Sequence, residues 1–194
     1  MVARYDRAMQ SRRPLLVVVS GAPASGKTTL ATRLAVDGEL TLVSKDAVKE
    51  ALADTLGHPD SVEALSTLGI GAYAAMFAMA KALLESGVDL AVESNFRRGK
   101  SEPELISLAS AADGRVIHCV ATPPTIRERY GNRTPDRHPA HLDVARHEDV
   151  MRDLADGRYE PLDLGWPTKV VATDEGYRPS YDELRAFALS RSSG

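Results

Sequence analysis

The sequence predicts an α/β protein with a three-layer α/β/α fold, in which helices cover both faces of a five-stranded parallel sheet and a helical lid is added. Short apolar segments typical of buried strands alternate with longer segments of helical periodicity. A glycine-rich loop joins the first strand to the first helix. Strands that alternate with helices form right-handed crossovers, which make the sheet parallel. Because the chain has 194 residues, we expect one domain over residues 1–194.

One or two helices are expected between each pair of successive strands. The predicted strands cover 15–20, 40–44, 88–93, 115–121 and 168–172. The predicted helices cover 27–36, 46–56, 61–86, 102–112, 123–130, 142–155 and 180–189. In a parallel sheet of this kind, ligands bind beyond the carboxyl ends of the strands. Functional residues are therefore expected directly after each strand.

The first strand is an apolar run at 15–20, and the motif G-x-x-x-x-G-K-[ST] follows it at residues 21–28. The glycines of such a phosphate loop let the backbone wrap a phosphate without Cβ clashes, and successive N–H groups at the helix N-terminus bind the anion. Lys27 would reach the β- and γ-phosphates, and the Thr28 hydroxyl would bind Mg²⁺. We therefore expect ATP and Mg²⁺ as cofactors. The residues expected to bind them are Gly21, Ala22, Pro23, Ala24, Ser25, Gly26, Lys27, Thr28 and Thr29.

The second strand, at 40–44, leads into the sequence KDAVK at 45–49. Asp46 would lie beside the phosphate loop, where an acceptor hydroxyl approaches the γ-phosphate, and a carboxylate there can act as a general base. The alternative is that Asp46 only caps the following helix. Lys49 projects from the same helical face, as a candidate for binding acceptor or phosphate or as a solvated lysine.

The long helix predicted over 61–86 carries a stripe of large side chains at helical spacing. The stripe consists of Tyr73, Met76, Phe77 and Met79. It is typical of a helix that faces the core, and the alternative is that Tyr73 or Phe77 lines an acceptor pocket. The apolar stretch 69–84 is interrupted by Lys81 and is too short to span a bilayer. We therefore expect no membrane segment.

The third strand, at 88–93, ends in Glu93. An acidic residue at this end of the sheet fills the Walker B role, in which it holds Mg²⁺ directly or through water. A carboxylate in an apolar run needs such a partner, because burying it unpaired is costly. Glu93 is also placed among the residues that face the substrate. Just beyond it, Asn95 is a candidate for binding substrate and Arg97 for pairing with anionic groups of the substrate.

The fourth strand, at 115–121, is followed by an arginine-bearing helix and then by a loop punctuated by Pro and Gly. This composition is typical of a mobile lid, which we place at about 127–141. Arginines that close over phosphates neutralise charge in the transition state. Arg129 and Arg133 would share one helical face provided that the helix continues through Gly131, and both are candidate catalytic residues. A surface ion pair is the alternative for any single arginine.

Three histidines lie in or after this loop, at positions 138, 141 and 147. Their spacing matches no strong zinc motif, so contact with substrate or exposure to solvent is expected instead of metal binding. His58 carries too little context for an assignment. The fifth strand, at 168–172, leads into the loop 173–179, which in folds of this type often contacts adenine; a plain turn is the alternative.

The composition is that of a soluble globular protein, with 43% hydrophobic and 26% charged residues. The net charge of −3 provides no global basic field for nucleic acid or anionic membranes, so nucleic acid is an unfavoured partner, although a local basic groove is compatible with this charge. The lone Cys119 lies in an apolar run and is expected to be a buried core residue. The N-terminal residues 1–13 are polar and lack the apolar core of a signal peptide, so we expect a cytoplasmic protein.

These residues resemble a known group, the small P-loop kinases of the AAA_33 type, which include polynucleotide 5′-kinases, chloramphenicol phosphotransferase and zeta-toxin-like kinases. The resemblance covers roughly 15–175 and rests on the phosphate loop, on KDAVK, on the strand ending Glu93-Ser94-Asn95 and on the arginines of 127–137. It implies a P-loop kinase fold and assigns the catalytic base to Asp46. Polynucleotide kinases have Arg where this chain has Lys49, and a lysine cannot form the same bidentate contact with phosphate.

We therefore expect an ATP-dependent phosphotransferase that acts on a hydroxyl of a small molecule, such as an antibiotic, a nucleoside or a sugar derivative. One alternative is a polynucleotide or tRNA 5′-kinase. A second is a nucleotide-dependent regulatory ATPase or GTPase. A D-x-x-G sequence does occur at 54–57, but inside a helical segment, and an N/T-K-x-D guanine motif is missing from the sequence. The identity of the acceptor is not encoded in any motif of the chain.

Overall fold

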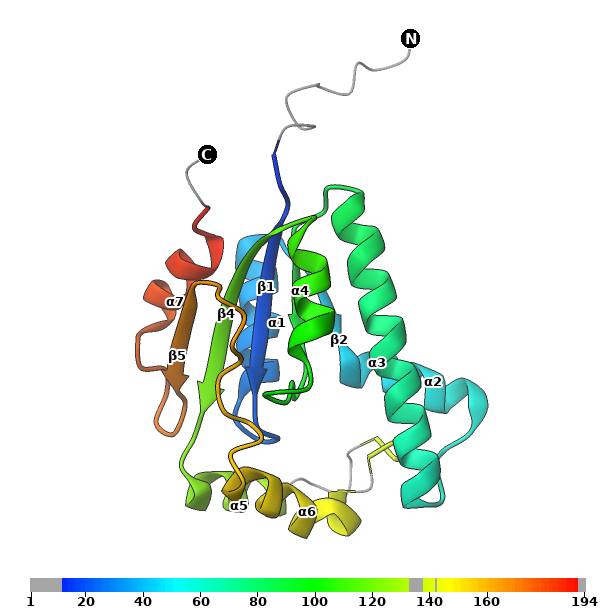
Figure 1. Cartoon of the computed structure of the whole chain (residues 1–194). Coiled ribbons are helices and arrows are strands. Elements are labelled where there is room, and N and C mark those ends of the chain that lie inside the picture. Colours follow the sequence, from blue (N-terminus) through cyan, green and yellow to red (C-terminus); the bar gives the residue numbers. More distant parts are fainter. Residues whose placement is uncertain (1–11, 133–137, 142, 192–194) are drawn as a thin grey trace.

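The computed structural model describes residues 12–132, 138–141 and 143–191, without the side chains of 143–146. Its centre is one sheet of five parallel strands in the order β2-β3-β1-β4-β5, with helices on both sides (Figure 1). The strands are β1 (Leu15–Gly21), β2 (Thr41–Ser44), β3 (Leu90–Glu93), β4 (Asp113–Val120) and β5 (Thr168–Ala172). The helices are α1 (Lys27–Gly38), α2 (Lys45–Leu56), α3 (Val62–Glu85), α4 (Glu102–Ala109), α5 (Pro123–Gly131), α6 (Asp143–Ala155) and α7 (Tyr181–Leu189).

The central strand β1 is buried along its whole length because helices cover both of its faces. Leu16 and Val18 pack on one face against α3 and α4, in a cluster that includes Met76 and Leu105. The residues between them, represented by Val17, pack on the other face against α1 and α7. Alternate residues of a strand point to opposite faces, so one continuous apolar run supplies both cores.

The sheet register brings the carboxyl ends of three strands together. Val19 of β1 is paired with Glu93 of β3, and Glu93 is paired in turn with Ser44 of β2. The phosphate loop leaves β1 at this edge and α2 leaves β2 there. Helices α5 and α6 lie across the same end of the molecule (Figure 1), where Ile126 of α5 packs against Ala22 of the loop. The topology therefore gathers the predicted functional segments at one edge.

The fold matches the elements expected from the sequence. Each predicted strand and helix is present, and the bounds differ mainly at the ends, for example in β3 and α4. Cys119 is buried, as expected, and burial raises the pKa of its thiol to about 12. On the far side of β4, the Trp166 ring covers Gly114 so closely that a Cβ on Gly114 would lie 2.5 Å from the ring.

Helix α3 (Val62–Glu85) extends beyond the apolar stretch 69–84 that the sequence analysis considered as a membrane segment. Its 24 residues are, by length and composition alone, enough to cross a membrane, which is weak evidence because core helices of soluble proteins pass the same criterion. Met76, Ala80 and Leu84 of α3 pack into the core beneath the sheet. The stripe prediction is therefore confirmed for Met76, whereas Met79 is exposed and Phe77 is partly buried against the same core.

Candidate active site

The phosphate loop between β1 and α1 has a backbone that only small residues accept. Gly21 has φ of 143°, and a Cβ on it would lie 2.3 Å from the carbonyl oxygen of Cys119. Ala24 and Gly26 also have positive φ values, of 65° and 79°. The Ser25 hydroxyl is buried and has no hydrogen-bond partner among the described residues. This conformation turns the loop into the anion-binding concavity expected at the N-terminus of a helix.

A buried carboxylate joins the loop to the neighbouring strands. Glu93, at the end of β3, is 2% exposed. Its Oε1 lies 3.7 Å from Lys27 Nζ and accepts a hydrogen bond from Thr28 Oγ1 at 3.2 Å, and its Oε2 accepts one from Ser44 Oγ at 2.7 Å. We call Glu93, Lys27, Thr28 and Ser44 the Glu93 cluster. Each of these contacts compensates part of the cost of burying the charge.

The Glu93 cluster fits the predicted metal site by its chemistry. A carboxylate and a hydroxyl at 3.2 Å from each other are the oxygen ligands that Mg²⁺ prefers, beside a loop shaped for phosphate. Lys27 is only 5% exposed and reaches back to the carbonyl oxygen of Ala22 at 3.4 Å, so its ammonium lies over the loop. Thr28 and Glu93, both predicted as metal ligands, are thus in direct contact.

Asp46 lies in the first turn of α2, two residues after the end of β2. It is not the residue at the cap position, which is Ser44, whose hydroxyl donates to Glu93 instead of capping the helix. The Asp46 carboxylate is partly exposed, and its Oδ1 lies 3.5 Å from Lys45 Nζ. A carboxylate in a first helical turn is favoured by the helix dipole. Asp46 therefore does not stand at the cap position itself, but its charge still stabilises the first turn of the helix.

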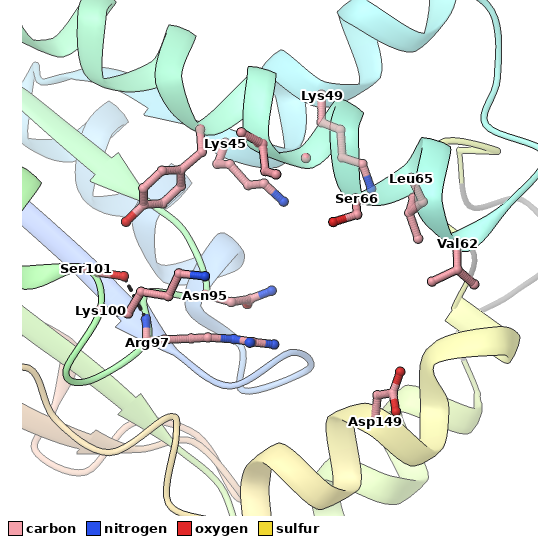
Figure 2. Close-up of a pocket in the computed structure, with 13 residues that line it drawn as sticks. Lys45, Lys49, Val62, Leu65, Ser66, Asn95, Arg97, Lys100, Ser101 and Asp149 are labelled. Carbon is pink, nitrogen blue, oxygen red and sulfur yellow. Dashed lines mark hydrogen bonds between the residues drawn. The ribbon is translucent and has the colours of Figure 1, made fainter.

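A cavity of about 460 Å³ opens next to the Glu93 cluster. We call it the α2–α3 cavity, because those helices and the β3–α4 loop form most of its walls (Figure 2). Its lining residues are Lys45, Lys49, Val62, Leu65, Ser66, Gly69, Ile70, Tyr73, Asn95, Arg97, Lys100, Ser101 and Asp149. All three residues predicted to bind substrate beyond Glu93, namely Lys49, Asn95 and Arg97, are in this set.

Several polar groups of the α2–α3 cavity are held in place by burial. Lys49 is 3% exposed, and Asn95 Oδ1 is buried without a hydrogen-bond partner among the described residues. Arg97 pairs with Asp153 of α6, and its backbone N–H donates to Ser101 Oγ at 2.9 Å. Burial raises the pKa of Tyr73 to about 12, opposed by its interaction with the Ser101 hydroxyl. The Tyr73 hydroxyl is therefore protonated at neutral pH.

Arg129 is directed toward the loop that follows β5. Its guanidinium donates to the carbonyl oxygens of Thr173 and Asp174, at 2.7 and 3.1 Å. Thr173 in turn donates through Oγ1 to the carbonyl oxygen of Ser25 at 2.8 Å, so Arg129 braces the phosphate loop through one intermediate residue. Hydrogen bonds from Thr122 and Thr125 lower the pKa of Asp174 to about 2.

The predicted pairing of Arg129 with Arg133 on one helical face stays a prediction. Helix α5 includes Gly131 as its last residue. Arg133 itself lies outside the described residues, as does most of the lid loop placed at about 127–141. Asn132 stands at the C-cap position of α5, where its backbone N–H donates to the carbonyl oxygens of Glu128 and Tyr130.

The segment 138–141 is tied to the outer face of α2. His138 Nε2 lies 3.0 Å from Asp54 Oδ1, and His141 Nε2 lies 2.8 Å from Glu50 Oε1. His58 packs edge-on against His138, and the ligand atoms of Asp54, His58 and His138 all lie within 4.8 Å of one another. Asp54 and His58 are four residues apart in the sequence, but His138 is distant from both, and no motif predicts that it joins them.

Several lining or supporting residues were not identified from the sequence, among them Ser44, Lys45 and Lys100. Ser44 and Lys45 stand at the carboxyl end of β2, so the rule that directs attention to strand ends would have selected them too. Lys100 lies seven residues beyond Glu93 in the β3–α4 loop, and only the tertiary fold brings it to the α2–α3 cavity.

Comparisons with known proteins agree with this architecture. The model of the AAA_33 family, described as an AAA domain, matches residues 16–156. A crystal structure of a protein from Chloroflexus aurantiacus J-10-fl, provisionally named a kinase, is 32% identical with a TM-score of 0.82, covering 94% of this chain and all of that one. A sugar kinase from Janibacter sp. HTCC2649, at 20% identity over 91% of this chain and 92% of its own with a TM-score of 0.55, shares the fold. No curated protein sequence matches the chain.

Proposed function

The chain belongs to the AAA_33 family, and we propose that it is an ATP-dependent kinase that transfers the γ-phosphoryl group to a hydroxyl of a small molecule. The observation that carries the proposal is the Glu93 cluster, which joins Lys27 and Thr28 of the phosphate loop to the carboxyl ends of β2 and β3. Lys45, the residue after Ser44, and Asn95, two residues after Glu93, line the α2–α3 cavity, whose volume suits a small acceptor. The kinase-like P-loop fold supports the same reaction class.

The donor side of the reaction falls to the phosphate loop. Its backbone N–H groups and Lys27 would hold the β- and γ-phosphates, and Thr28 with Glu93 would hold Mg²⁺. When bound, Mg²⁺ offsets the charge of the phosphate oxygens. Lys27 is already positioned by Glu93, so little reorganisation is needed when charge develops on the transferred group.

On the acceptor side, Asp46 would take the proton of the attacking hydroxyl. Asp46 lies in the first turn of α2, two residues after Ser44, which pairs with Glu93 at the end of β3. In the sequence it also lies between the cavity-lining residues Lys45 and Lys49, which supports this role. Asn95 and Arg97 would orient the acceptor. In this arrangement the protein contributes position and charge, which account for most of the rate in phosphoryl transfer.

The arginines of α5 and the lid would neutralise charge on the transferring phosphoryl group. Arg129 now binds the Thr173–Asp174 backbone, two contacts away from the phosphate loop, and a catalytic role for it requires the guanidinium to turn from those carbonyls. Arg133 is retained in the proposal as the second lid arginine. A cavity of about 460 Å³ favours a small acceptor over a nucleic-acid end.

The proposal is tested by incubating the protein with labelled ATP and pooled nucleosides, sugars, antibiotics and oligonucleotides. We expect Mg²⁺-dependent label transfer to a small hydroxyl compound. Asp46→Asn should lower kcat by about 10²-fold or more while leaving ATP affinity unchanged, because a general base contributes about 10² to 10⁴. Near wild-type turnover of Asp46→Asn would remove Asp46 from the mechanism. ATP hydrolysis without transfer to any acceptor, or labelling of oligonucleotides alone, would overturn the proposed acceptor class.

A further inference from the structure

The α2–α3 cavity is more basic than a pocket for a neutral acceptor requires. Among its lining residues, Lys45, Lys49, Arg97 and Lys100 carry positive charge and only Asp149 carries negative charge. Asp149 is itself exposed and forms an ion pair with Arg152 at 3.0 Å. The chain as a whole has a net charge of −3, so this local excess of cations runs against the composition of the molecule.

The cations stand on two opposing walls of the cavity. Lys45 and Lys49 come from α2 on one side, and Arg97 and Lys100 come from the β3–α4 loop on the other. Figure 2 shows the nitrogen ends of all four side chains turned toward the space between the walls. A ligand in that space would meet positive charge from both sides, which is the arrangement that selects an anion.

Burial makes this arrangement costly without an anionic partner nearby. Lys49 is 3% exposed and has a partner within the protein, and a buried ammonium is stable only beside groups that offset its charge. Two of the cations are partly balanced by acids outside the lining set, since Lys45 lies 3.5 Å from Asp46 and Arg97 pairs with Asp153. Lys100 is exposed and has no partner of this kind among the described residues.

The remaining wall, from α3, leaves room for the body of the ligand. Gly69 has no side chain at the point where α3 approaches Lys45, whose Nζ would lie 4.0 Å from an added Cβ. Val62, Ile70 and Tyr73 give this wall an apolar surface with one buried hydroxyl. Asn95 adds a buried amide oxygen that can accept a hydrogen bond from a ligand hydroxyl.

We propose that the phosphoryl acceptor of this enzyme is itself an anion, a small polyhydroxylated molecule carrying a phosphate or carboxylate group that Lys49, Arg97 and Lys100 bind between the two walls. This inference rests on the proposed kinase function and specifies its substrate class. The hydroxyl to be phosphorylated would lie at the Lys45 side of the cavity, within reach of Asp46. The oxygen of that hydroxyl bonds to the γ-phosphorus, the bond to the β,γ-bridging oxygen breaks, ADP leaves, and the hydroxyl proton passes to Asp46.

The test uses full-length protein saturated with Mg²⁺ and a non-hydrolysable ATP analogue, so that the phosphate loop is filled. Ribose 5-phosphate, ribonate and ribose are titrated at constant ionic strength by calorimetry. At least one of the two anions should bind about tenfold or more tightly than ribose, because each charge-assisted contact is worth about tenfold. Preference for ribose 5-phosphate over ribonate identifies a phosphate site, and the reverse preference a carboxylate site.

Variants locate the binding in the cavity. Lys49→Gln and Lys100→Gln should each weaken anion binding about tenfold or more. Lys49 is buried, so its variant can fail to fold; Lys100 is exposed, so Lys100→Gln tests the same site without that risk. Lys81→Gln, a surface lysine of α3 that pairs with Glu85, should bind anions as the wild type does. Equal binding of ribose and both anions, or unchanged anion binding in both cavity variants, would overturn the inference. Failure of the ATP analogue to bind would instead overturn the proposed function, and this inference with it.

Discussion

The two halves of the site are built in different ways. In the donor half, the functional side chains bond to one another: Lys27, Thr28 and Ser44 all contact Glu93. In the acceptor half, the side chains of the α2–α3 cavity come from α2, α3, α6 and the β3–α4 loop and face a common space (Figure 2). The donor half is therefore fixed by the sheet register, whereas the acceptor half is fixed by how helices pack beside the sheet.

This difference indicates which half is free to vary. Substitution of a Glu93 cluster residue leaves a buried partner unsatisfied and is expected to harm every reaction of the enzyme. Substitution in the α2–α3 cavity alters contacts to the acceptor without disturbing the phosphate loop. We expect one fold to serve many acceptors by keeping the first half and changing the second.

The largest effect is expected from Lys27→Ala in the donor half. Loss of this ammonium would remove the charge proposed to bind the transferred phosphate and would leave the 2%-exposed Glu93 without its cationic partner. We expect label transfer from ATP to fall by at least about 10³-fold with every acceptor, because one preorganised electrostatic contact is worth about 10² to 10³. Lys81→Ala is the matched control on a solvent-exposed face. If Lys27→Ala retains a tenth of the wild-type activity, the contacts of the Glu93 cluster are not what the donor half depends on, and the contrast between the two halves is weaker than the geometry indicates.

The backbone of the donor half should also resist change. Gly21→Ala places a Cβ 2.3 Å from the carbonyl oxygen of Cys119 in a conformation with φ of 143°. Gly57→Ala is the matched control, since Gly57 has φ of 100° but nothing within 4 Å of an added Cβ. Backbone strain alone lowers the free energy of unfolding by about 1 to 3 kcal/mol. Gly21→Ala should lower it by more than that, because the added Cβ also collides with the carbonyl oxygen of Cys119. Urea unfolding measures the loss of stability in Gly21→Ala and in Gly57→Ala. Equal losses in the two variants would contradict a close-packed phosphate loop.

The strand pair beneath the phosphate loop should make folding sensitive to acid. Burial lowers the pKa of His118 to about 4, and its Nδ1 lies 2.9 Å from Ser20 Oγ. The unfolded chain, with an ordinary histidine pKa near 6.5, binds the proton more readily. Stability is therefore complete above about pH 6.5 and falls by about 3 kcal/mol as the pH drops toward 4.

Variants assign this acid sensitivity to its residue. In His118→Asn, urea unfolding at pH 7.5, 5.5 and 4.5 should show a smaller loss of stability at low pH than in the wild type. His58→Asn, at an exposed histidine, should retain the wild-type pH dependence. An unchanged slope in His118→Asn would attribute the sensitivity to other groups.

The smallest effect is expected in the acceptor half. Asn95→Ala removes a buried amide that lines the α2–α3 cavity and should raise KM for the acceptor about tenfold, the value of one hydrogen bond to a polar ligand. KM for ATP should not change in the same variant, which serves as the internal control. An equal rise in KM for the acceptor and in KM for ATP would mean that Asn95 contributes to both halves of the site.

The sequence predicts most of the residues that the structure gathers around the phosphate loop, because each belongs to a motif or directly follows an apolar strand. Residues 21–28 form a continuous motif, and Glu93 and Asp46 follow strands whose apolar runs are plain in the sequence. The parallel topology then requires their carboxyl ends to meet, as the pairing of Ser44 with Glu93 bears out.

The acceptor half could be predicted only in part. Lys49, Asn95 and Arg97 were placed there through their nearness to strand ends, but Lys100 and the α3 wall depend on helix packing that no short motif specifies. Tyr73 is the clearest case, since one side chain both packs on the core and lines the cavity. Helical periodicity alone treats these roles as alternatives.

The position of Trp166 has a spectroscopic consequence. It is the single tryptophan of the chain, and its ring lies on Gly114 at the start of β4. Gly114 is paired with Leu16 near the amino end of β1, whereas the phosphate loop follows the carboxyl end of that strand. Its fluorescence emission therefore reports on the integrity of the sheet with little direct influence from ligands. Unfolding of the sheet and occupancy of the site can thus be followed as separate signals in one sample.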